Sequence, residues 1–252
     1  MSYPTEIIEL PSKGIFYNED NPLSKGTIEL FLPTAKHEDI LTSKNLINKG
    51  IVIDELLKSL IVNKNIDYNT LLSIDKSALI IAARILLYSN EYSPTTKCPS
   101  CDASQIHKID LHDIDVSDFD ESEFEKGVNE FKFTLPKSKT NIKFKLLTIE
   151  DELKIASQLK VIKKNFNGAE PEVTTRLSFI ITEWEGERSQ AKIKKLISDN
   201  LLTNDSLAFR EYMKNTFPHL NEDVVFECNI CGHSEVRPLP LDISFFWPSS
   251  RG

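Results

Sequence analysis

Four cysteines, arranged as two C-x2-C pairs, constrain the fold of this chain more than any other feature. The pairs stand in "CPSC" (98–101) and "CNIC" (228–231). A C-x2-C pair puts two thiolates on one tight turn with backbone N–H groups directed at the sulfurs, which is half of a tetrahedral metal site. Two pairs supply the four soft ligands that Zn²⁺ prefers. We therefore predict one structural zinc ion per chain, held jointly by Cys98, Cys101, Cys228 and Cys231.

The expected cellular compartment favours metal over disulfides. The N-terminal "MSYPTEIIELPSKG" lacks a basic segment followed by an apolar run, so no signal peptide is predicted. The longest apolar stretch, "ALIIAARILLY", is too short to cross a bilayer. In a reducing cytoplasm, spaced cysteine pairs bind metal more often than they form disulfides.

Other uses of the cysteines are weaker hypotheses. Iron in a rubredoxin-like site has the same spacing and stays open as an alternative to zinc. A redox role for "CPSC" needs a thioredoxin-like βαβ setting, which the sequence lacks. His107 and His233 follow the two pairs closely, but four thiolates already fill a tetrahedral site.

The segments around the two cysteine pairs match each other at a constant separation. We call this separation, from Cys98 to Cys228, the repeat offset. "LLSID" (71–75) aligns with "LLTND" (201–205) at the repeat offset, without a gap up to the cysteines. Further upstream, three pairs of segments match with length differences: "LPSKGIFY" with "LPKSKTNIKFKL", "HEDIL" (37–41) with "IEDEL" (149–153), and "LLKSLIVN" (56–63) with "IKKLISDN" (193–200). These matches predict an internal duplication.

The predicted fold class is α+β, with two pseudo-repeated halves at 1–112 and 131–252. Each half is expected to contain a small β-sheet, helices and one zinc knuckle, with the two knuckles jointly forming one zinc-ribbon-like site. Strands are predicted from the β-rich alternation at 27–33, 130–136 and 141–147. Asp75 and Asp205 are expected to be the N-caps of the last helix of each half. In the second of these helices, the residues expected to face inward are Leu207, Ala208, Phe209, Tyr212 and Met213.

Two segments are interpreted with alternatives. Residues 113–130 are dense in acid and are predicted to be an acidic linker, with docking of a basic partner as the alternative. Near the C-terminus, Phe245, Phe246 and Trp247 either cover the core of the second knuckle or anchor a partner protein.

Composition and motifs argue against several classes of function. A site closed by four thiolates offers no open position for catalysis, and the sequence contains no H-E-x-x-H, G-x-S-x-G or Walker motif. No enzyme activity and no small-molecule substrate are therefore predicted. The net charge of −8 argues against nucleic acid and anionic membrane as partners.

The order of several segments resembles the T-even-type bacteriophage baseplate hub proteins. The resemblance rests on "ELPSKGIFY", "GTIELFLP" with "HEDIL", "LLSIDKSALIIAARILLYSNEY" leading into "CPSC", and the closing C-x2-C-G-H followed by "FFWP". It implies a structural or assembly protein of a contractile tail that contacts other tail or baseplate hub proteins. It further implies a location in the host cytoplasm during tail assembly, or in the virion baseplate. The alternative is a cytoplasmic zinc-ribbon adaptor that binds another protein or nucleic acid.

Overall fold

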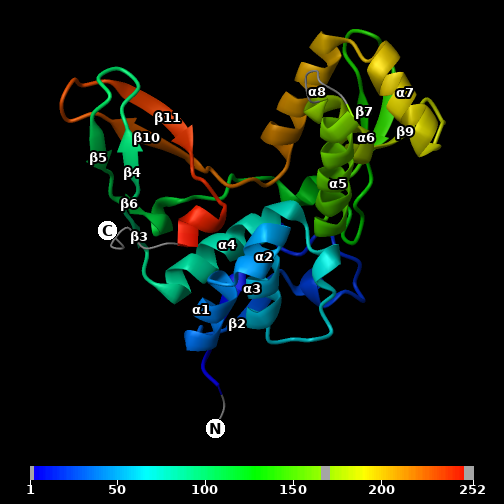
Figure 1. Cartoon of the computed structure of the whole chain (residues 1–252). Coiled ribbons are helices and arrows are strands. Elements are labelled where there is room, and N and C mark those ends of the chain that lie inside the picture. Colours follow the sequence, from blue (N-terminus) through cyan, green and yellow to red (C-terminus); the bar gives the residue numbers. More distant parts are fainter. Residues whose placement is uncertain (1–2, 166–170, 247–252) are drawn as a thin grey trace.

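The computed structural model describes residues 3–165 and 171–246. Figure 1 shows three parts: the helices α1–α4 at the bottom, a lobe with α5–α8 at the upper right, and two β-hairpins at the upper left. The described part of the chain is thus α+β, with small antiparallel sheets and eight α-helices.

The first half begins with a hairpin and continues with helices. Its strands and helices are, in order, β1 (Thr5–Glu9), β2 (Thr27–Phe31), α1 (Ala35–Leu41), α2 (Lys44–Lys49), α3 (Val52–Leu60), α4 (Ser73–Leu87), β3 (Glu91–Tyr92), β4 (Thr95–Lys97), β5 (Ser104–Ile106) and β6 (Ile109–Asp110). β1 pairs with β2, β4 with β5 and β3 with β6.

The second half again starts with a hairpin and ends with one. It consists of β7 (Phe131–Thr134), β8 (Asn141–Phe144), α5 (Ile149–Asn165), α6 (Glu172–Ile180), β9 (Ile181–Trp184), α7 (Gln190–Asn200), α8 (Thr203–Thr216), β10 (Asp223–Glu227) and β11 (Ser234–Pro238). The sheet order is β7-β8-β9, and β10 pairs with β11. The strands predicted at 27–33, 130–136 and 141–147 are confirmed as β2, β7 and β8.

The predicted N-caps are wrong, since α4 begins at Ser73 and α8 at Thr203. Asp75 and Asp205 are each the third residue of their helix and are fully buried. Their carboxylates accept hydrogen bonds from the turn that follows the first strand of each half. Asp75 accepts from the Ser12 backbone N–H at 3.0 Å, and Asp205 from the Lys137 N–H at 2.6 Å and the Ser138 N–H at 3.0 Å. Each aspartate therefore fixes a hairpin turn onto a helix rather than capping that helix.

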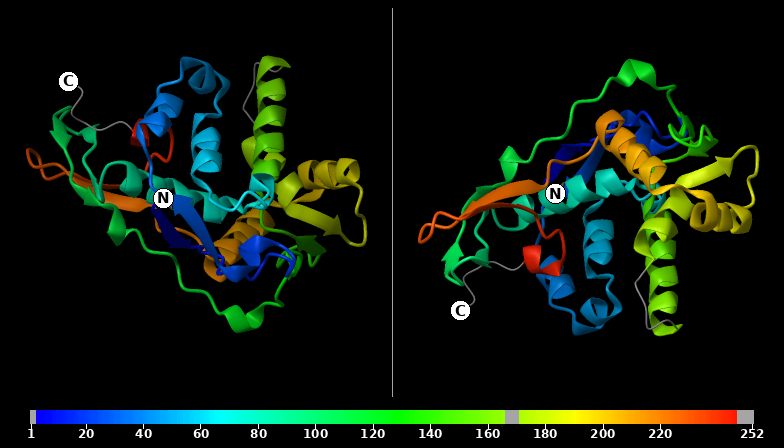
Figure 2. Two further views of the ribbon diagram at one scale, coloured as in Figure 1. Left: turned by 90° about the horizontal axis from the view of Figure 1, so that it is seen from below. Right: turned by 90° about the horizontal axis from the view of Figure 1, so that it is seen from above.

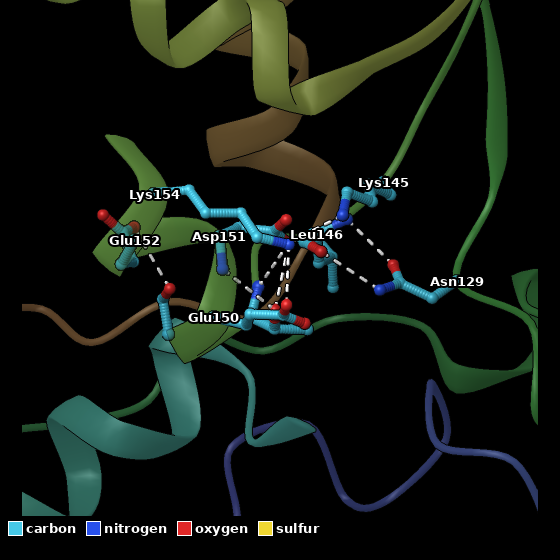
Figure 3. Close-up of polar contacts among 9 residues, drawn as sticks. Asn129, Lys145, Leu146, Glu150, Asp151, Glu152 and Lys154 are labelled. Atoms are coloured by element: carbon cyan, nitrogen blue, oxygen red, sulfur yellow. Dashed lines mark hydrogen bonds and ion pairs between the residues drawn. The ribbon is translucent and has the colours of Figure 1, made fainter. Parts of the chain in front are cut away.

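The start of α5 joins the two halves (Figure 3). The Ile149 N–H donates to the Leu71 carbonyl at 2.8 Å, and the Ser73 N–H donates to the Leu147 carbonyl at 2.9 Å. The Ser73 hydroxyl also donates to Glu152 at 3.1 Å, where α4 and α5 begin side by side. Backbone pairing across this junction places the second half directly on the first.

The side chains in Figure 3 hold the first turn of α5. Asp151 accepts from the Thr148 backbone N–H at 3.1 Å and pairs with Lys145 at 2.7 Å. Asn129 donates to the Leu146 carbonyl at 3.0 Å and accepts its N–H at 2.8 Å. Acidic residues near a helix N-terminus are favoured by the free N–H groups there, so the acidic "IEDEL" segment suits the start of this helix.

At the start of α1, a histidine side chain accepts a hydrogen bond from the backbone N–H of the residue before the helix. The Thr34 backbone N–H donates to Nδ1 of His37 at 2.8 Å, so the ring proton sits on Nε2. His37 is 1% exposed, and among the described residues Nε2 has no hydrogen-bond partner. Burial lowers the pKa of His37, because a charged ring is poorly solvated there.

We expect this histidine to make folding sensitive to mild acid. Because the folded pKa lies below the unfolded value of about 6.5, the unfolded chain binds the proton first. The stability from neutral His37 is present above that pH and is lost as the pH falls below it. His37→Gln keeps a capping acceptor without titrating. Urea unfolding at pH 7.5 and 5.5 should show a smaller loss of stability for this variant than for the wild type, and equal losses would contradict the assignment.

One continuous apolar core runs through both halves. Rings from the two halves meet in it, since Phe16 contacts Phe131 at 5.7 Å and Phe217 at 6.0 Å between ring centroids. In α8, Phe209 is fully buried as predicted, but Leu207 is 49% exposed, so its predicted inward orientation is wrong. No helix among the described residues is long and apolar enough to cross a membrane.

The acidic linker (113–130) makes several contacts with the rest of the molecule. Phe119 and Phe124 pack against Phe16, with centroid distances of 6.1 and 5.2 Å. The Ser117 N–H also donates to the His219 carbonyl at 2.8 Å. Figure 2 shows the linker running along the outside of the molecule between the hairpins and β7. The linker follows the surface because the rings of Phe119 and Phe124 pack on the core, whereas the carboxylates between them remain exposed to water.

Candidate metal centre

The four cysteines lie in the turns of two matching hairpins. In the first, the Cys98 N–H donates to the Ala103 carbonyl at 2.9 Å and the Asp102 N–H donates to the Cys98 carbonyl at 3.0 Å. In the second, the Cys228 N–H donates to the His233 carbonyl and the Gly232 N–H to the Cys228 carbonyl, both at 2.8 Å. Each contact of the first turn thus recurs in the second at the repeat offset.

Both turns also need a left-handed residue at the same place. Asp102 has φ 59° and Gly232 has φ 70°. Glycine adopts this conformation without cost, and aspartate is among the other residues that tolerate it best. The sequence thus folds each C-x2-C segment into the same tight turn.

The two hairpins lie beside each other (Figure 1), and side-chain hydrogen bonds join them. Gln105 donates to the Glu227 carbonyl at 2.8 Å and accepts from the Asn229 N–H at 3.0 Å. In return, Arg237 donates to the Lys97 carbonyl at 3.2 Å. Lys97 and Glu227 are related by the repeat offset, so the same backbone position accepts a hydrogen bond from the opposite hairpin on each side.

This docking brings all four sulfur atoms together. The ligand atoms of Cys98, Cys101, Cys228 and Cys231 lie within 4.8 Å of one another. Sγ of Cys98 is 3.7 Å from Sγ of Cys231, and the corresponding distance between Cys101 and Cys228 is 3.6 Å. Four sulfurs at about 2.3 Å from a tetrahedral ion are about 3.8 Å apart. The geometry therefore fits a single metal ion with four thiolate ligands.

The electrostatics of the cluster also favour a cation. Backbone N–H groups of Cys231 and Ile230 lower the pKa of Cys228 to about 6. For Cys101 the Ala103 N–H acts in the same direction, but the three neighbouring thiols outweigh it and raise the pKa to about 12. Four adjacent thiols cannot all ionise without a compensating positive charge, which a bound divalent ion supplies.

The histidines near the knuckles have other contacts. The ring of His107 lies 4.8 Å from that of Phe226, and its Nε2 is 2.9 Å from Gln105. Among the described residues, neither His107 nor His233 belongs to the group of side chains placed to share a metal ion. The group of side chains that could hold a metal ion thus consists of the four cysteines.

The C-terminal aromatic residues lie elsewhere. Phe245 and Phe246 are fully buried, and the Phe245 ring packs against Tyr92 at 4.9 Å. Arg84, buried in α4, donates from Nε to the Phe245 carbonyl at 3.0 Å. In this conformation these two rings cannot act as an exposed anchor for a partner, and they cover α4 rather than the second knuckle. Trp247 lies outside the described residues.

Arg84 is a structural residue that the sequence did not reveal. Its guanidinium lies over the Tyr88 ring at 4.7 Å and also donates to the Ser89 carbonyl at 3.2 Å. The only available signal was a single cation within the apolar stretch "ALIIAARILLY", which does not identify the carbonyl that it binds.

Comparison with known proteins identifies a family for this chain. The family model described as T4 bacteriophage base plate protein matches residues 17–247. No curated protein and no solved structure matches the chain significantly. The matched segment begins after the first strand and extends through both knuckles to the C-terminal aromatic residues. On this evidence, the chain belongs to the family of T4 bacteriophage base plate proteins.

Proposed function

We propose that the protein is a structural or assembly component of the central baseplate hub of a contractile-tailed phage. The match of the base plate family model to residues 17–247 carries this proposal. The protein acts by contacting other tail or baseplate hub proteins rather than by catalysis. It works in the host cytoplasm during tail assembly and is a candidate component of the finished virion baseplate.

In this role the metal is structural, and we assign it as zinc. The sulfur spacing suits a closed tetrahedral site, and all four positions are filled by thiolates. Each hairpin supplies two ligands, so the metal ties the end of the first half to the end of the second. A zinc ion at this site would cross-link the β4–β5 and β10–β11 hairpins, which are far apart in the sequence.

The proposal includes an internal duplication, supported by contacts that recur in both halves. The turns, the aspartates at the third helical position and the knuckles follow the same plan. α3 and α6 each have nine residues, and the residue after each helix pairs with the second hairpin strand, Ile61 with Leu30 and Ile181 with Phe144. Within the proposed duplication, we therefore pair the segment 56–63 with the end of α6 and the start of β9, whereas its sequence match pairs it with α7.

Quantitative mass spectrometry of purified virions and of baseplate assembly intermediates tests the proposed function. Stoichiometric presence of the protein in virions would identify it as a structural component. Presence in assembly intermediates but not in virions would identify it as an assembly factor. Absence from both would contradict the proposal.

A further inference from the structure

The β10–β11 hairpin carries three exposed apolar side chains, two of them side by side on its outer face. Val225 and Val236 lie directly opposite each other on the two strands and are 66% and 62% exposed. Ile230, at the tip between the two cysteines, is 73% exposed. The inner face of the same hairpin carries the buried Phe226 and Cys228 and packs toward the first hairpin. We call Val225, Ile230 and Val236 the outer apolar patch.

The first hairpin does not present the same surface. At the repeat offset, Val225 corresponds to Thr95 and Ile230 to Ser100. Only Ile106, the counterpart of Val236, is also apolar. The two hairpins share their turns, their cross-strand register and their metal ligands. A metal site therefore does not require apolar side chains at these outer positions, and the patch on the second hairpin needs a separate explanation.

Charges around the patch indicate the chemistry of what covers it. Asp223 and Glu227 precede and follow Val225 by two residues, so both carboxylates lie on the same face of β10 and both are exposed. A shallow cavity of about 290 Å³ borders Val225, and Asp110 and Asp113 add two more carboxylates to its lining, with Lys108 as the cation. The patch thus has a predominantly acidic rim.

We propose that the outer apolar patch is the docking site for another base plate protein, one that presents an apolar surface rimmed by lysine and arginine. Complementary charge favours such a partner and speeds its association. A second copy of this chain is disfavoured, because an isologous contact through this face would bring the same carboxylates together. The hairpins project from the body (Figure 1), which leaves this face accessible. The inference rests on the proposed function and specifies its contact surface.

The test measures binding of the full-length, metal-loaded protein to each other base plate protein of the same phage, purified singly, by biolayer interferometry. The key variant combines Val225→Thr with Ile230→Ser, the residues that the first hairpin carries at the matching positions. We expect at least a tenfold weaker affinity, from the apolar area no longer buried. The matched control is Ile106→Thr on the first hairpin, which should bind like the wild type. Both variants should keep the wild-type metal content and unfolding midpoint.

A charge variant tests the rim separately. Asp223→Asn with Glu227→Gln should slow association several-fold at low salt and reduce its dependence on ionic strength. Binding that persists unchanged in both the patch and the rim variants would overturn this docking site while leaving the base plate role intact. Self-association that disappears in the patch variant would overturn the choice of partner. If the wild type bound none of these proteins, the docking site and the proposed function would fail together.

Discussion

Replacing either Cys98 or Cys228 with serine is expected to abolish stable metal binding and to separate the two hairpins. The two residues come from different halves, and each lies within 3.7 Å of a cysteine on the opposite hairpin. Binding of a structural zinc ion contributes on the order of 10 kcal/mol to the folding of small modules. Because each variant has only three of the four thiolate ligands, we expect its affinity for zinc to be much lower. Elemental analysis of the purified variants should show less than one tenth of an equivalent of zinc.

The matched control is His233→Ala, which changes a residue beside the second knuckle without removing a sulfur ligand. It should retain a full equivalent of metal. Limited proteolysis should cut the hairpins of both cysteine variants but not those of this control. A full equivalent of metal in both Cys98→Ser and Cys228→Ser would refute the shared site.

Removing the carboxylate of Asp75 is expected to have the second large effect. This carboxylate accepts the Ser12 N–H at 3.0 Å, the Ser12 hydroxyl at 2.7 Å and the Tyr17 hydroxyl at 2.5 Å, all in the core. Burial raises the pKa of Asp75, although the hydrogen bonds from Tyr17 and Ser12 partly oppose this. Asp75→Ala leaves these donors buried without an acceptor, which costs about 1–3 kcal/mol for each group. We expect a loss of about 3–5 kcal/mol in urea unfolding.

Two further variants make this prediction sharper. Asp205→Ala removes the acceptor of two backbone N–H groups in the second half and should also destabilise strongly. Asp39→Ala, on the exposed surface of α1, should change stability by less than about 0.5 kcal/mol. A loss for Asp75→Ala no larger than that for Asp39→Ala would show that the turn does not depend on this carboxylate.

The features predicted well from sequence are those determined by nearby residues. The C-x2-C turns depend on a few consecutive residues and on the chemistry of sulfur, so the grouping of Cys98, Cys101, Cys228 and Cys231 followed from spacing. The strands β2, β7 and β8 were recognisable because alternation is a local pattern.

The features that were missed depend on distant partners. An aspartate near a helix start suggests an N-cap, and only the fold shows that Asp75 reaches Ser12, 63 residues earlier. Phe119 and Phe124 stand in an acidic segment whose composition predicts solvation, but their rings find a place in a core formed by both halves. Phe245 was open to two interpretations because nothing local reveals the Arg84 side chain that binds its carbonyl.

Electron microscopy of tails from a phage in which the gene for this protein is deleted tests the baseplate role directly. We expect infected cells to contain no complete baseplates, and we expect the wild-type protein supplied from a plasmid to restore them. Supplying Cys98→Ser should not restore them, because the two halves are then no longer joined by metal. Normal baseplates and undiminished yields of infectious particles in the deletion phage would contradict a role in the baseplate.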